Sequence, residues 1–120
     1  MALVAKRGTN KTLDTALLPL DFLREATECL KCVAHPNRLR MIEILFHGEY
    51  TVDEIASLCG LAQPATSGHL RLMEGKGLLQ SEHRGRAVYY SVRKPQLKGI
   101  IDCVRGRYQQ QCNDNEGGVR

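Results

Sequence analysis

The sequence contains few aromatic residues, and this scarcity excludes one class of nucleic-acid binder. Among 120 residues there are two Phe, four Tyr and no Trp. Proteins that hold single-stranded nucleic acid without sequence preference stack successive bases on several aromatic side chains. We therefore expect no stacking platform for single strands.

Long apolar runs are also missing. No uncharged apolar stretch approaches the ~18 residues that a membrane-spanning helix needs. The N-terminal segment has no apolar core after its first charged residues, which argues against a secretory signal. We therefore expect no membrane association and a cytoplasmic location. The 42% hydrophobic and 25% charged residues are typical of a globular protein, and 120 residues suit one domain.

Positive charge is unevenly distributed along the chain. Residues 12–67 carry four basic and eight acidic residues, whereas residues 68–107 carry nine basic and three acidic residues. A basic segment of this kind, without a basic amphipathic helix, favours a nucleic-acid partner over a membrane surface.

The pattern of apolar residues predicts a flexible arm over residues 1–17, a folded domain over 18–112 and a flexible tail over 113–120. Within the domain, apolar residues recur at three- and four-residue steps in a first helix that begins around residues 18–21. Pro36 suits the first turn of a second helix, because the missing N–H of proline would be unpaired there. The last helix is predicted to begin near Pro95.

A helix-turn-helix followed by a hairpin is predicted between these helices. Thr51 and Glu54 form a capping box at the start of a short helix, and Gly60 ends it. A further helix opens at Gln63-Pro64 and runs to about Glu74. Two strands then flank a turn at Arg84-Gly85-Arg86. The fold class is therefore mainly α with one β-hairpin, a winged helix-turn-helix.

Several segments resemble signatures of the ArsR/SmtB repressors, in family order and spacing over roughly residues 20–108. They are Leu30–Arg40, Glu54–Ala56 with Gly60-Leu61, Gln63–Leu70 with its Ser-x-His-Leu core, and Val88–Ser91 of the wing. The resemblance implies a homodimeric repressor that is not an enzyme and that dimerises through its first and last helices. It also implies binding to double-stranded operator DNA and release by an effector, most often a metal ion or a thiol-reactive species.

The chain also departs from that family. Ala62 replaces the usual Ser N-cap of the recognition helix and Gly68 lies inside it, and each change lowers helix stability by about 1 kcal/mol. The family's Cys-Val-Cys segment is missing, and so is the Asp/His ligand set of the last helix in zinc sensors. The family's effector sites therefore cannot be transferred to this chain.

Polar residues of the recognition helix and wing are the candidate DNA contacts. Gln, Ser, Thr and Arg can all hydrogen-bond base edges in the major groove, and basic side chains bind phosphates. His69 has no partner at metal-ligand spacing, so we expect a groove or packing role for it. The predicted DNA-binding residues are Gln63, Thr66, Ser67, His69, Arg71, Lys76, Arg84 and Arg86.

Four of the five cysteines are the candidate effector ligands, and Cys59 is excluded from that set. Cys29 and Cys32 lie one helical turn apart and could clamp a soft ion, with a further thiolate from Cys103 or Cys112 of either chain. Three thiolates would suit arsenite or another thiophilic ion, and no resident cofactor is expected. Oxidation to a disulfide or persulfide is the second possibility, and inert packing is the third. Cys59 is expected to end a buried helix.

The predicted function is therefore repression from an inverted-repeat operator, relieved by a soft metal, metalloid or thiol-reactive effector. Two alternatives remain open at this point. One is a winged-helix DNA-binding protein that needs no effector and whose cysteines only pack. The other is a thiol oxidoreductase, although the Cys-x-x-Cys pair lies deep in a helix instead of at a helix start after a strand, where the thiol pKa would be lowered.

Overall fold

The computed structural model describes residue 13 and residues 15–119, with side chains described up to residue 114. The chain divides into two compact units, residues 1–31 and residues 32–120. Most of the arm predicted over residues 1–17 lies outside the described residues. Within it, Leu13, Thr15 and Ala16 are helical.

Helix α2 (Leu20–Val33) begins where the sequence predicts the first helix. Asp21 in its first turn and Lys31 in its last turn complement the helix dipole. Apolar side chains such as Phe22 are largely exposed, whereas Cys32 and Val33 at the C-terminal end are buried.

Helix α3 (Pro36–Leu45) starts at the proline, as predicted, and His35 is its N-cap. Its residues Met41, Ile42 and Leu45 are buried and form the centre of the second unit. The other fully buried apolar side chains come from the two helices that follow, the first strand of the hairpin and the connection that precedes it: Ile55, Leu70, Met73, Leu78 and Leu79.

The helix-turn-helix is present at the predicted position. Helix α4 (Val52–Cys59) carries the capping box: the Thr51 hydroxyl accepts from the Glu54 N–H (3.2 Å), and Glu54 accepts from the Thr51 N–H (2.8 Å). Gly60 ends the helix in the left-handed conformation with φ 69°. Helix α5 (Gln63–Gly75) follows, and Ala62 provides no side-chain cap.

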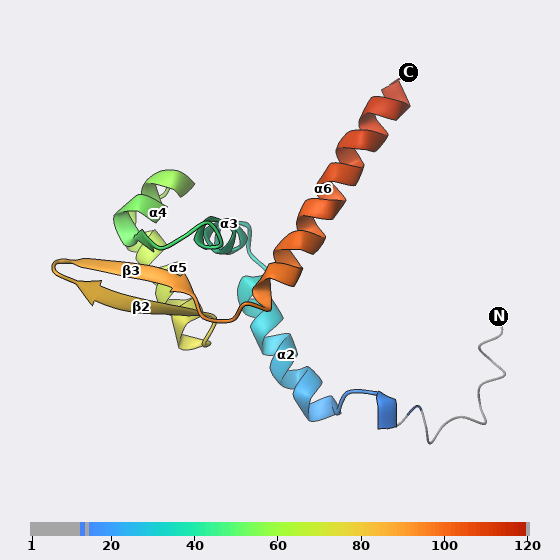
Figure 1. Ribbon diagram of the computed structural model, residues 1–120, viewed down its shortest axis with the longest axis horizontal. Helices are drawn as coiled ribbons and strands as arrows, with labels where there is room; N and C mark the ends of the chain where they lie inside the picture. Colours follow the sequence, from blue (N-terminus) through green and yellow to red (C-terminus); the bar gives the residue numbers. More distant parts are fainter. Residues whose placement is uncertain (1–12, 14, 120) are drawn as a thin grey trace. The chain divides into compact units, whose positions relative to one another are not determined.

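The wing is an antiparallel hairpin of β2 (Leu79–Arg84) and β3 (Ala87–Val92), with Arg84 opposite Ala87 at its tip. Gly85 has φ 65° in the connecting turn, a conformation that glycine adopts without strain. In Figure 1 the tip of the hairpin points away from α6. A short strand missed by the sequence analysis, β1 (Tyr50–Thr51), pairs with β3 and makes a three-stranded sheet in the order β1-β3-β2.

Helix α6 (Leu97–Val119) contacts α3, and Leu97 and Ile101 in its first turns are buried. It does not end near residue 112, because residues 113–119 of the predicted flexible tail continue the helix. Once a helix is nucleated by packed turns, each added residue gains one backbone hydrogen bond, which extends a polar segment that could not start a helix alone. None of the helices in the described part of the chain has the length and apolar character needed to cross a membrane.

Candidate nucleic-acid interface

Helix α5 presents some of its predicted contacts to solvent and buries one. Gln63 and Arg71 are exposed, and Ser67 is half-buried with its hydroxyl accepting from Arg71 Nη1 at 2.7 Å. Thr66 has 0% exposure and donates its hydroxyl to the Ala62 carbonyl at 3.0 Å. The structure therefore removes Thr66 from the predicted DNA contacts.

Helical periodicity explains the burial of Thr66. Leu70 and Met73 lie four and seven residues further along α5, so all three residues share the face that packs into the core. The hydroxyl is compatible with burial because it bonds a carbonyl of the preceding turn.

His69 lies on α5 in contact with the start of α3. Its Nδ1 accepts from Arg38 Nε at 3.1 Å, and its ring centroid is 4.8 Å from that of His35. Desolvation lowers the pKa of His69, and the neighbouring His35 and Arg38 lower it further. The hydrogen bond from Arg38 and these neighbours all favour the neutral form of the ring.

The two wing arginines differ in their surroundings. Arg84 Nη2 donates to Glu49 and to Glu82, each at 2.7 Å, and its guanidinium lies 4.7 Å from the ring centroid of Tyr89. Hydrogen bonds to Glu82 and Glu49 raise the pKa of Arg84 above its ordinary value. Arg86 at the tip is exposed and makes no ion pair with any described residue.

The wing and the recognition helix are joined by Glu74, a connection that the sequence analysis missed. The Glu74 carboxylate accepts from the Ser81 hydroxyl at 2.7 Å and from the Tyr90 hydroxyl at 3.4 Å. Burial and the nearby Glu74 carboxylate raise the pKa of Tyr90. The end of α5 is therefore fixed to both strands of the hairpin.

Lys76, another predicted phosphate contact, is exposed directly after α5.

The candidate effector cysteines lie on α2 and α6. Cys29 is half-buried, Cys32 is buried with 5% exposure, Cys103 is exposed and Cys112 is half-buried. A hydrogen bond with Cys112 and the electrostatic interaction with that residue raise the pKa of Tyr108, one turn away on α6. Within the described residues, no group of three or more His, Cys, Asp or Glu side chains is arranged to hold a metal ion.

Cys59, which the sequence analysis excludes from the effector site, ends α4 as expected. It is half-buried, and this burial raises the pKa of its thiol, although Arg40 opposes the shift.

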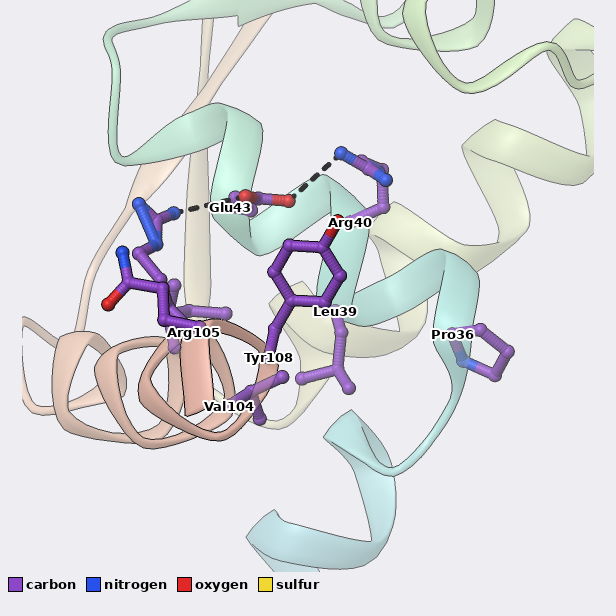
Figure 2. A pocket seen from close by; sticks show the side chains of 9 residues that line it. Pro36, Leu39, Arg40, Glu43, Val104, Arg105 and Tyr108 are labelled. Atoms are coloured by element: carbon purple, nitrogen blue, oxygen red, sulfur yellow. Dashed lines mark hydrogen bonds and ion pairs between the residues drawn. The ribbon is translucent and has the colours of Figure 1, made fainter. Parts of the chain in front are cut away.

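A groove of about 710 Å³ runs between α3 and α6 (Figure 2). Leu39, Val104 and Tyr108 gather along it, with Val104 48% and Tyr108 66% exposed. At its edge, Glu43 accepts from Arg40 at 3.1 Å and from Arg105 at 3.0 Å, which links α3 to α6. The groove is an apolar surface bordered by charges.

Helix α4, helix α5 and the β2–β3 hairpin together define the class: a winged helix-turn-helix DNA-binding domain. Residues 35–81 match the family profile described as "Bacterial regulatory protein, arsR family". The transcriptional repressor PagR of Bacillus anthracis is 38% identical over 80 residues, which are 66% of this chain and 80% of that protein. The regulator YgaV of Escherichia coli is 31% identical over 70% of this chain and 86% of that protein.

Solved structures agree with these similarities. The crystal structure of PagR matches with a TM-score of 0.63 and 34% identity over 72% of this chain and 99% of that one. NolR from Sinorhizobium fredii matches with a TM-score of 0.69 and 26% identity over 77% and 94% of the two chains. The chain belongs to the ArsR family. It is a DNA-binding transcriptional regulator, which excludes the oxidoreductase alternative.

Proposed function

We propose that the chain is a homodimeric repressor that binds an inverted-repeat operator with α5 in the major groove and the wing on the phosphate backbone. The observation that carries this proposal is that α5 exposes polar side chains to solvent. Glu74, at the end of α5, is hydrogen-bonded to the hairpin, and the tip of that hairpin is basic. Gln63, Ser67 and Arg71 are the proposed base-edge contacts. Lys76 and Arg86 are the proposed phosphate contacts, with Arg84 in a lesser role.

The apolar groove supports the homodimer. Exposed Val104 and Tyr108 on α6 lie beside Leu39 of α3, and a surface of this kind gains stability when a second copy covers it. A winged helix-turn-helix domain from Mycobacterium bovis with the same fold, 21% identical with a TM-score of 0.69, is homodimeric. A two-fold dimer requires half-sites about one helical turn, or a multiple of it, apart.

We infer that the effector is a soft metal ion, a metalloid such as arsenite or a thiol-reactive species acting at Cys29 and Cys32. Both cysteines belong to α2 at helical i, i+3 spacing, and Cys103 or Cys112 of either chain would supply a further thiolate. Relatives include a probable mercury resistance operon repressor of Streptomyces lividans, 27% identical over 78% of this chain. The competing function is DNA binding without an effector, with the cysteines only packing.

The decisive experiment is a binding titration with a duplex taken from upstream of the protein's own gene. Fluorescence anisotropy should give nanomolar affinity at physiological salt, compared with micromolar or weaker affinity for a scrambled duplex. Equal affinity for both duplexes would contradict the proposed repressor.

Replacing Arg86 by Ala should weaken operator binding and flatten its salt dependence. The slope of log K against log salt concentration should fall by about 0.9 for each phosphate that the variant no longer neutralises. Arg84→Ala should flatten the slope less than Arg86→Ala does, because Glu49 and Glu82 already engage the Arg84 guanidinium. Equal slopes for Arg86→Ala and wild type would show that the tip of the wing does not contact phosphate.

Effector titrations of single Cys→Ser variants test the thiol site. Arsenite, zinc, cadmium or a persulfide donor should release wild-type protein from the operator, with a coupling of roughly 5- to 150-fold in affinity. Cys29→Ser and Cys32→Ser should each abolish that response. Comparison of Cys103→Ser with Cys112→Ser should identify the third thiolate. Cys59→Ser should respond as wild type. An unchanged response in both α2 variants would assign those cysteines to packing.

A further inference from the structure

Arg38 connects the end of α2 to the recognition helix. From its half-buried position on α3, its Nη1 donates to the Cys32 carbonyl at 3.0 Å and its Nε donates to His69 Nδ1 at 3.1 Å. A guanidinium has only donors and stays charged at any physiological pH. His69 Nδ1 must therefore be the acceptor, and the hydrogen of the neutral ring is assigned to Nε2 by the chemistry of this partner.

The protonated nitrogen of His69 reaches solvent. No hydrogen bond from Nε2 is present among the contacts of the described residues. No buried side-chain nitrogen or oxygen in that part of the chain lacks a partner, so Nε2 is not buried. His69 consequently offers one outward N–H donor from α5.

His35 restricts the same ring from a second side. Its own Nδ1 accepts from the Asn37 N–H at 3.1 Å while it caps α3, and its ring contacts that of His69 at an angle of 51°. A proton on His69 Nδ1 would eliminate the acceptor for Arg38 and place a second cation beside the guanidinium. The groups that face His69, Arg38 on α3 and His35 at its N-cap, thus both favour the neutral ring.

We propose that Arg38 is a positioning residue that fixes His69 as a neutral, outward N–H donor, and that this donor reads an acceptor on a base edge in the operator half-site. The acceptors that the major groove offers are guanine O6 and N7, adenine N7 and thymine O4. The proposal rests on the proposed function, since it gives His69 a specific contact within the α5–DNA interface. Through the Cys32 carbonyl, the same guanidinium ties that contact to the end of α2.

The first test needs no DNA. Long-range ¹H–¹⁵N spectra of the histidine rings in the DNA-free protein should show His69 with its proton on Nε2. Arg38→Met should produce a mixture of the two tautomers and raise the pKa of His69, because a neighbouring positive charge is removed. Arg38→Lys keeps the positive charge but loses the two-pronged geometry of the guanidinium. The pKa of His69 should therefore stay close to its wild-type value in this variant, whereas a mixture of tautomers should still appear.

Arg40→Met is the control for that experiment, since Arg40 lies two residues away on α3 and bonds Glu43 instead. It should leave the His69 signals unchanged. A His69 ring with its proton on Nδ1 in wild-type protein would overturn the assignment to Arg38. The tautomer is measured independently of whether the protein represses, so a failure here is distinguishable from failure of the proposed function.

The second test pairs protein and DNA variants. His69→Gln keeps an amide N–H near the position of Nε2, and His69→Asn keeps polar atoms only near Nδ1. His69→Asn should bind the operator roughly 5- to 10-fold more weakly than wild type, and His69→Gln should lie within about 3-fold of it.

Operator duplexes in which one base at a time lacks its acceptor, such as 7-deazaguanine for guanine, should locate the contact. At one position, the modified base should weaken binding of the wild-type protein by roughly 5- to 10-fold and leave the affinity of His69→Asn unchanged. The proposal would be overturned if His69→Asn bound every duplex, including a scrambled one, more weakly than wild type by the same factor. That result would show that His69 contacts the phosphate backbone or supports the fold.

Discussion

Replacing Val104 by Glu is expected to convert the dimer to a monomer and to weaken operator binding by roughly 100-fold or more. Val104 lies 48% exposed on α6 beside the apolar groove, where a second copy is proposed to pack. A carboxylate at this position would have to be desolvated in the interface, where Arg40 and Arg105 are already paired with Glu43, and an uncompensated buried charge is strongly destabilising. A monomer carries one recognition helix and loses the second half-site.

Sedimentation velocity at micromolar concentration and anisotropy with the operator duplex measure the two consequences. Gln110→Glu is the control, because it adds the same charge to an exposed position of α6 that does not line the groove. A dimeric Val104→Glu variant with wild-type affinity would place the dimer interface elsewhere.

Leu70→Ala is expected to lower the free energy of unfolding by about 2–5 kcal/mol, the usual range for a leucine removed from a packed core. Leu70 is fully buried on α5 and, with Met73, anchors the recognition helix to the rest of the domain. Leu72→Ala is a matched control with the same chemical change on the same helix at a residue that is 41% exposed.

Urea unfolding at a fixed protomer concentration compares the three proteins, because the stability of a dimer depends on concentration. Leu72→Ala should lose about 1 kcal/mol or less. Equal losses for the two variants would mean that α5 is not anchored through Leu70.

Local signals in the sequence predicted most of the fold. The capping box at Thr51 and Glu54, the proline start at Pro36 and the glycine stop at Gly60 each act through neighbouring backbone groups, so the sequence alone identifies them. The two-residue strand β1 carries no such signal, since its existence depends on pairing with β3 across a long stretch of chain.

The candidate interface was less predictable because its details depend on contacts between distant residues. The sequence predicts Arg84 as a phosphate contact, but Glu49, which lies 35 residues earlier, forms an ion pair with it. The sequence predicts Thr66 as a contact in the DNA major groove, yet Thr66 shares a helix face with Leu70 and lies in the core. Arg38 and His69 are 31 residues apart, and no pattern along the chain marks their hydrogen bond.

The contact of Glu74 with both wing strands has a consequence for the kinetics of DNA binding. Taken alone, α5 has a weak beginning at Ala62 and a flexible residue at Gly68, but the attachment to the hairpin restrains its far end before DNA arrives. The conformational entropy of aligning helix and wing is then lost during folding instead of during association. Effector-driven changes in affinity should consequently appear mainly in the lifetime of the complex, while the rate of encounter stays governed by the basic charge of residues 68–107.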